Sequence, residues 1–144
     1  LRPGSITEEQ ILQFAPAVIK DYEDENSTNV NHANHYTPNS NCVLVYSKDN
    51  KKMVDEINKI SSKYSKPCIL STHENLSFYS ANTVIDIGSK SNLNEIARNI
   101  FSCLKKADSF SPDIVIIEGV EESGIGAAIM NRLLKACKEN YVEI

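Results

Sequence analysis

Four consecutive β-branched residues, Ile114 to Ile117, constrain the fold of this chain more than any other feature of its sequence. The run is bounded by Pro112-Asp113 and Gly119, and it lacks the alternation of apolar and polar residues that marks a half-exposed strand. Such a run is typical of a strand that has both faces buried in a parallel sheet. We therefore predict a buried strand over residues 114–117.

The residues after this strand change to helical periodicity. Apolar side chains recur at Ile125, Ala128, Ile129, Leu133 and Ala136, which places them on one stripe of a helix. We expect Ser123 to be the N-cap of this helix, because its hydroxyl can accept a hydrogen bond from a free backbone amide. A strand, a short turn and a helix in this order form half of a βαβ unit.

The turn between them contains Gly124-Ile-Gly126, which is similar to the start of a dinucleotide-binding fingerprint. Ile129 stands where the third glycine of that fingerprint would be, and the acids near the turn, Glu118 among them, would repel an anion. The pattern therefore favours close packing of helix on strand. A ligand-binding turn formed by Glu118, Gly124 and Gly126 is the alternative interpretation.

Length and composition indicate a single soluble globular domain of ordinary size. The chain has 144 residues, 41% of them hydrophobic and 24% charged. Its formal net charge of −4 argues against direct nucleic-acid binding, which usually requires a basic face. The sequence contains neither an apolar run of membrane-spanning length nor a signal peptide, so we expect no membrane association.

The cysteines predict a reducing compartment. Cys42, Cys68, Cys103 and Cys137 lie far apart in the sequence, and no pair has CxxC spacing. Three of them fall in or beside predicted strands and helices. Buried free thiols are therefore expected rather than a disulfide framework, and the expected location is cytoplasmic.

Strands and helices alternate along most of the chain. We predict strands over residues 43–46, 67–70, 83–88 and 141–144, a helix over residues 49–64, and a second helix through Leu93 and Leu104 that Ser91 caps. This alternation predicts an α/β domain, with a Rossmann-like, open, mostly parallel sheet and helices on both faces.

The part of the chain before residue 42 is less regular. Residues 21–41 are acidic and polar and are predicted to be a linker. Within them, His32 and His35 have a spacing that could supply half of a metal site, but no carboxylate or thiol pattern completes it. We expect no metal. His73 follows a predicted strand and is expected to be a surface or capping residue.

The chain lacks a recognisable set of catalytic residues. It contains no phosphate-binding loop ending in Lys-Ser or Lys-Thr, no nucleophile elbow and no Cys–His signature. Glu118 is the best-placed acid, because open α/β sheets bind ligands beyond the carboxyl ends of their strands. We favour the interpretation of Glu118 as an exposed acid of a turn over this ligand-binding role. We assign no catalytic residue.

Several stretches together resemble a known family. Leu1-Arg-Pro-Gly-Ser-Ile-Thr7 is similar to the closing strand and turn of a YrdC-like catalytic domain. His35-Tyr-Thr-Pro38, followed by the strand, resembles the interdomain linker of two-domain threonylcarbamoyl-AMP synthases. Ile116-Ile-Glu-Gly119 and Gly124 to Arg132 resemble the signature of the smaller C-terminal domain of the same enzymes. These stretches occur in the family's order and span nearly the whole chain.

The resemblance implies three segments: residues 1–20 as the tail of the catalytic domain, 21–41 as the linker, and 42–144 as the C-terminal domain. It also implies a parent nucleotidyltransferase that joins L-threonine, bicarbonate and ATP, with magnesium, into threonylcarbamoyl-AMP for tRNA modification. Arg2 and Tyr36 would contact ATP in that enzyme, and His35 and Pro38 would close the linker over it. The implied partner is the upstream YrdC-like domain in cis, and this chain alone would be an inactive accessory domain without a cofactor.

A second hypothesis comes from a different functional class. The same α/β pattern suits a free-standing Rossmann-like binding or interaction module that docks a partner or a small anion at the strand ends.

Overall fold

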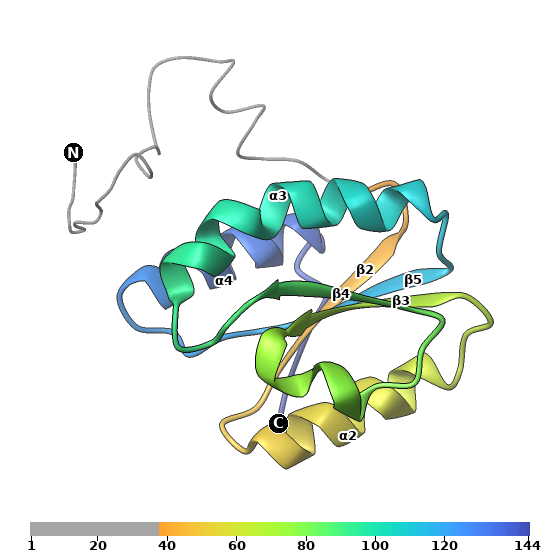
Figure 1. Ribbon diagram of the computed structural model, residues 1–144, viewed down its shortest axis with the longest axis horizontal. Coiled ribbons are helices and arrows are strands. Elements are labelled where there is room, and N and C mark those ends of the chain that lie inside the picture. The colour runs from red at the N-terminus through yellow and green to blue at the C-terminus, as the bar shows by residue number, and fades with distance from the viewer. Residues whose placement is uncertain (1–37) are drawn as a thin grey trace.

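A computed structural model describes residues 38–144, and within them five strands form one open sheet (Figure 1). The strands are β2 (Asn41–Tyr46), β3 (Pro67–Thr72), β4 (Thr83–Gly88), β5 (Ile114–Glu118) and β6 (Tyr141–Glu143). Their order in the sheet is β4-β3-β5-β2-β6, and every neighbouring pair is parallel. The predicted Rossmann-like α/β fold is therefore confirmed.

Three helices and one 3-10 helix connect these strands. They are α2 (Asn50–Ser61), η3 (His73–Phe78), α3 (Leu93–Ser109) and α4 (Ile125–Ala136). Asp49 caps α2, because its carboxylate accepts the backbone amides of Lys51 and Lys52. Among the helices of residues 38–144, none has both the length and the apolar character that crossing a membrane requires.

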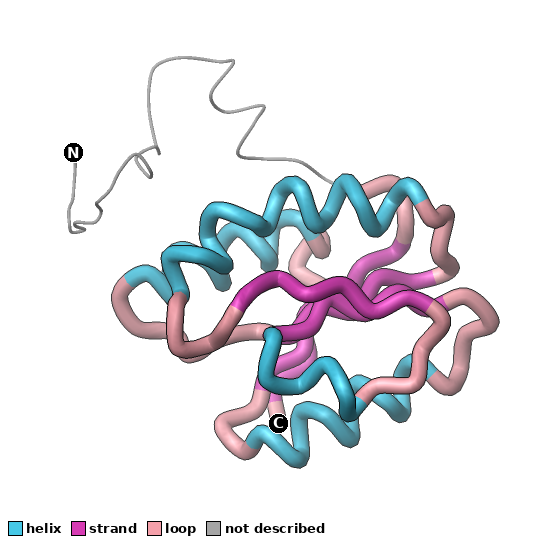
Figure 2. Tube along the Cα trace, in the orientation of Figure 1, coloured by secondary structure: helices cyan, strands magenta, loops and turns pink. Residues whose placement is uncertain are grey.

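The helices cover both faces of the sheet, as predicted. In Figure 1, α3 and α4 lie on one side of the strands and α2 lies on the other, and Figure 2 shows the strands as a layer between the helices. Successive residues of β5 pack on opposite faces of the sheet. Val115 and Ile117 join the core under α3 and α4, whereas Ile114 and Ile116 join the core against α2. The predicted burial of this strand on both faces is confirmed.

Strand β5 is the centre of the sheet, although it is the fourth strand in the described sequence. Ile114 pairs with both Asn41 of β2 and Pro67 of β3. The chain therefore places β5 between two strands that precede it, and this insertion brings the carboxyl ends of β2, β3 and β5 together.

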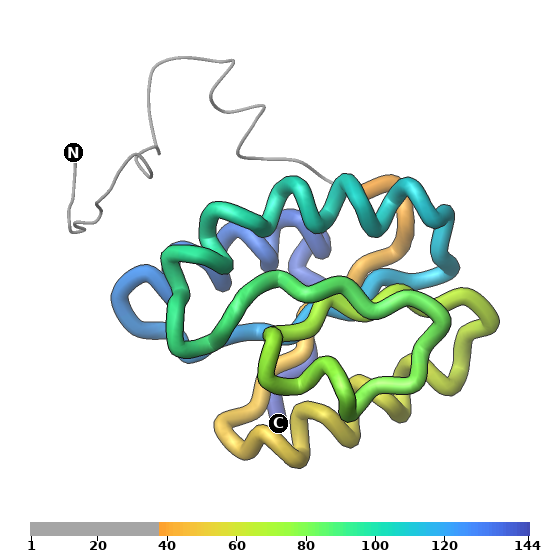
Figure 3. Tube along the Cα trace, viewed as in Figure 1, coloured from red at the N-terminus to blue at the C-terminus, as the bar shows by residue number. Residues whose placement is uncertain are grey.

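Several predicted boundaries differ from the structure. Strand β3 continues two residues beyond Leu70 to Thr72, α2 is shorter at both ends than the predicted 49–64, and β6 ends at Glu143. Asn92, not Ser91, caps α3. The cap of α4 is Gly124 and not Ser123, and no side chain accepts a hydrogen bond there. The 3-10 helix η3, on the same side as α2 in Figure 3, was not predicted.

All four cysteines are free and buried, as predicted. Cys42 Sγ and Cys137 Sγ lie 3.0 Å apart, which raises the pKa of the Cys42 thiol through their hydrogen bond and through burial. Burial likewise raises the pKa of Cys68 to about 11. The thiols of Cys42 and Cys68 are therefore protonated at neutral pH, and all four cysteines are small apolar residues of the core.

Candidate functional site

The carboxyl ends of β2 and β5 enclose a cavity of about 210 Å³. From β2 the chain continues into α2 on one face of the sheet, and from the adjacent β5 it continues into α4 on the other face. Neighbouring connections that leave on opposite faces create a crevice, which is where open α/β sheets bind ligands. Residues after β2, β4 and β5 line this cavity together with Thr72 at the end of β3.

Glu118 forms part of the cavity wall, yet its side chain is 0% exposed. Its Oε1 accepts hydrogen bonds from the Thr72 backbone amide at 3.0 Å and from Thr72 Oγ1 at 2.7 Å. Its Oε2 accepts bonds from Asn75 Nδ2 at 3.1 Å, from Ser71 Oγ at 3.3 Å and from the hydroxyl of Tyr79. The interpretation of Glu118 as an exposed turn acid is therefore wrong. Its carboxylate joins the end of β5 to the end of β3 and to η3.

The hydrogen bonds continue from Glu118 to the surface. Asn75 and Asn50 exchange two amide bonds, each 2.9 Å long, and Lys90 Nζ donates to Asn50 Oδ1 at 3.1 Å. The network thus links the first residue of α2 with η3 and with the loop after β4. Buried polar groups that are all paired in this way stabilise one arrangement of the connected elements.

Tyr79 is part of the same network. Burial raises the pKa of its hydroxyl, and the Glu118 charge and hydrogen bond raise it further. Tyr79 therefore remains a neutral donor to Glu118 at physiological pH. Thr72, Asn75 and Tyr79 follow no periodic pattern in the sequence, although two polar residues directly after the apolar strand 67–70 indicate that a polar partner lies nearby.

Of the two glycines of the Gly124-Ile-Gly126 turn, only Gly126 is needed for close packing. A Cβ atom on Gly126 would lie 1.9 Å from the carbonyl oxygen of Glu121 and 3.5 Å from Leu93 Cδ1. Gly126 thus packs closely against the backbone of the turn and against α3, whereas we expected it to pack against the sheet. Gly124 adopts φ +57° with open space around its Cα, so its need for glycine is conformational. Ligand binding by this turn stays a prediction, and neither glycine lines the cavity.

Of the remaining predicted site residues, the structure describes only Pro38. Arg2, His35 and Tyr36 lie outside the described residues, as does His32 of the half metal site. Pro38 is the first described residue and is buried. The predicted roles of these residues in ATP binding and linker closure stay predictions.

His73 follows β3, as predicted, and lies on the surface. Its Nδ1 atom lies 2.8 Å from Asp86 Oδ2 on the neighbouring strand β4. This hydrogen bond and the negative charge of Asp86 raise the pKa of the imidazole. Because the pair is exposed to solvent, its effect on stability is small.

We expect Asp86→Asn to lower the pKa of His73, and the imidazole resonances in an NMR pH titration would measure this. The asparagine oxygen can still accept the bond that Gly88 N donates to Asp86, so the loop is retained. The raised pKa means that the pair contributes stability fully below the unfolded-state pKa of about 6.5. That contribution to stability is lost as the pH rises through the pKa of His73 in the folded state. An unchanged His73 pKa in Asp86→Asn would show that Asp86 does not raise the pKa of this imidazole.

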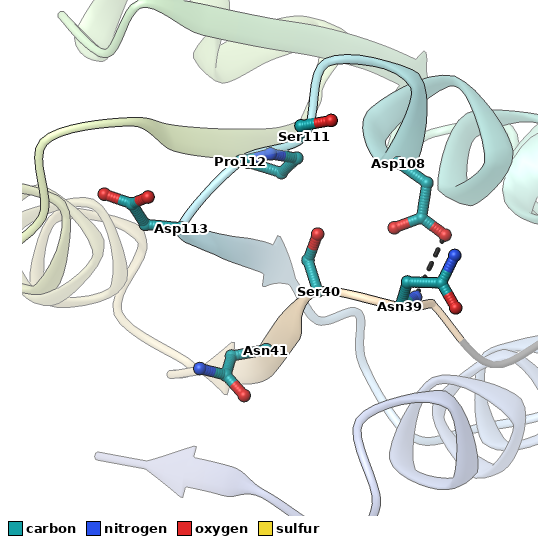
Figure 4. A pocket seen from close by; sticks show the side chains of 7 residues that line it. All are labelled: Asn39, Ser40, Asn41, Asp108, Ser111, Pro112 and Asp113. Carbon is teal, nitrogen blue, oxygen red and sulfur yellow. Dashed lines mark hydrogen bonds between the residues drawn. The ribbon is translucent and has the colours of Figure 1, made fainter.

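A second, more open hollow of about 430 Å³ lies at the opposite, amino edge of the sheet. Figure 4 shows its polar lining and the bond of 3.1 Å from the Asn39 backbone amide to Asp108. Asp113 accepts the backbone amides of Ser65 and Lys66, and the Ser65 hydroxyl bond lowers its pKa most. These acids therefore stabilise the loops at the start of β2, β3 and β5.

Comparisons with known proteins identify relatives over the whole chain. Residues 6–137 match the family described as threonylcarbamoyl-AMP synthase, C-terminal domain. The threonylcarbamoyl-AMP synthase of Pyrococcus abyssi is 30% identical over 100% of this chain, and that of Bacillus subtilis is 30% identical over 94%. The chain spans only 43% and 40% of the length of these two relatives.

Solved structures agree with the sequence comparisons. The crystal structure of P. abyssi Sua5 complexed with L-threonine superposes with a TM-score of 0.66 at 31% identity, covering 76% of this chain and 32% of that one. The C-terminal Sua5 domain from Pyrococcus horikoshii gives a TM-score of 0.57 at 29% identity, covering 75% of this chain and all of that one. With the fold and the family match in agreement, the chain belongs to the family of threonylcarbamoyl-AMP synthase C-terminal domains.

Proposed function

We propose that this chain is the accessory C-terminal domain, with its linker, of an L-threonylcarbamoyladenylate synthase. The observation that carries the proposal is the family match over residues 6–137, together with relatives of that name that are more than twice as long. The parent enzyme would join L-threonine, bicarbonate and ATP into threonylcarbamoyl-AMP and release pyrophosphate. Its product would supply the threonylcarbamoyl modification of adenosine in tRNA.

In this proposal the partner is a YrdC-like catalytic domain in cis. Residues 1–20 are its tail and residues 21–41 are the linker, with Arg2 and Tyr36 contacting ATP and His35 and Pro38 closing over it. A guanidinium fork such as that of Arg2 matches phosphate oxygens well. ATP with magnesium is the parent's substrate, and the chain itself needs no cofactor. We also propose that the protein is cytoplasmic and binds neither nucleic acid nor membranes directly.

The chemistry of the described domain supports an accessory role. A general base needs a lone pair within reach of a substrate proton. Glu118 is the buried acid at the strand ends, and five hydrogen bonds occupy its carboxylate, from Ser71, Thr72, Asn75 and Tyr79. Its carboxylate thus holds structure and is not available to activate a substrate.

We expect the 144-residue chain, supplied with L-threonine, bicarbonate, ATP and magnesium, to release no pyrophosphate above a protein-free blank. The full-length product of the gene should release it under the same conditions, and omission of threonine is the control for simple ATP hydrolysis. Pyrophosphate release by the 144-residue chain would refute its inactivity. A full-length protein without threonine-dependent release would refute the proposed reaction.

A further inference from the structure

The cavity between β2 and β5 carries hydrogen-bond donors that the fold leaves unused. Ser47 lines it and is only 4% exposed, and its Oγ accepts the Asp49 backbone amide at 3.1 Å. Among residues 38–144, no group accepts the hydrogen of this hydroxyl. A buried donor without an acceptor costs free energy, so a ligand oxygen at this position would be stabilising.

Two ammonium groups lie at the same cavity. Lys48 is exposed and has no hydrogen-bond or ion-pair partner in the part of the chain that the structure describes. Lys90 gives one of its three N–H groups to Asn50 Oδ1 and keeps the others for a further acceptor. An acceptor shared by Ser47, Lys48 and Lys90 would best be a negatively charged oxygen.

The acids of the lining do not cancel these donors. Glu118 is 0% exposed, and its two oxygens already accept hydrogen bonds from Ser71, Thr72, Asn75 and Tyr79. Glu121 is exposed at the rim, where water and salt screen its charge. The rest of the lining is apolar and includes Met53, Leu93 and Val120.

We propose that this cavity binds a small organic anion. Its carboxylate or phosphate would contact Ser47, Lys48 and Lys90, and a short apolar body would lie against Met53, Leu93 and Val120. The volume of about 210 Å³ equals that of ~7 waters at about 30 Å³ each, below the ~300–1,000 Å³ of sites for larger ligands. The inference does not depend on the proposed synthase reaction.

The test uses the full 144-residue chain labelled with ¹⁵N and three probes that each carry a butyl group: pentanoate, butyl phosphate and 1-butanol. Binding of an anion should shift the backbone amide resonances of Ser47, Lys48, Asn50 and Gly119 at millimolar concentration. Butanol, which lacks the charge, should bind at least tenfold more weakly. Binding of both anions supports the proposal and shows that the cavity accepts carboxylates and phosphates alike. Binding of only one anion supports the proposal and shows which of the two groups the cavity recognises.

Lys48→Met should weaken anion binding about tenfold, which corresponds to the loss of one charge-assisted contact. The fold should survive because Lys48 is exposed and its side chain makes no hydrogen bond or ion pair within residues 38–144, and the amide spectrum verifies this. Lys63→Met is the matched control, since this exposed lysine follows α2 at the opposite edge of the sheet. Equal affinity for butanol and the anions, equal affinity of the two variants, or the absence of shifts at these amides would each overturn the proposal.

Discussion

Glu118→Ala is expected to lower the free energy of unfolding by roughly 3–5 kcal/mol. The substitution removes the acceptor of five hydrogen bonds, which come from the Ser71 hydroxyl, the Thr72 amide and hydroxyl, Asn75 and Tyr79. Each buried donor left unpaired costs about 1–3 kcal/mol, and water entering from the adjacent cavity offsets part of the sum. Urea denaturation followed by circular dichroism measures the change.

Two further variants separate this explanation from a general effect of removing a charge. Glu122→Ala, at an exposed position of the same turn, should change stability by less than about 0.5 kcal/mol. Glu118→Gln retains the shape of the side chain but places an NH₂ group beside hydrogen-bond donors. The free energy of unfolding that it loses should therefore lie between the losses for Glu118→Ala and Glu122→Ala. If Glu118→Ala unfolds at the same urea concentration as Glu122→Ala, the buried network does not stabilise the domain.

Gly126→Ala is expected to destabilise the domain by roughly 1–3 kcal/mol. The new methyl group would lie 1.9 Å from the Glu121 carbonyl oxygen, and this neighbour is backbone, so the turn itself must move. At an unhindered helical position the same change would stabilise by about 1 kcal/mol, because alanine favours helices over glycine. The sign of the change therefore reports the close packing directly.

Ala127→Ser, on the exposed side of α4, is the control for Gly126→Ala and should change stability by less than about 0.5 kcal/mol. Thermal unfolding of both variants provides the measurement. A melting temperature for Gly126→Ala equal to or above that of the unmodified chain would rule out the close approach between α4 and the turn.

The regular elements of this domain could be predicted because their sequence periods are clear. The β-branched run ending at Ile117 and the helical spacing from Ile125 to Ala136 were each assigned correctly to β5 and α4. Caps were less predictable, since Ser91 and Asn92 can both accept an amide hydrogen bond and only the final backbone path selects one.

The environment of Glu118 could not be predicted in the same way. An acid after an apolar strand is usually solvated, and its partners Thr72 and Tyr79 lie far from it in the sequence. Only the insertion of β5 beside β3 brings them together, and strand order leaves no local signal in the sequence. The six-residue η3 also lacks the length over which helical periodicity becomes visible.

The central place of β5 also determines when this domain can fold during synthesis. Strands β3 and β4 are neighbours in sequence and in the sheet, so they can pair as soon as both have left the ribosome. Strand β2 has only β5 and β6 as neighbours, and both are translated after α3. The nascent chain must therefore carry β2 without a strand partner until Ile114–Glu118 emerges. This high contact order slows folding and exposes the chain to aggregation or to chaperones in the interval.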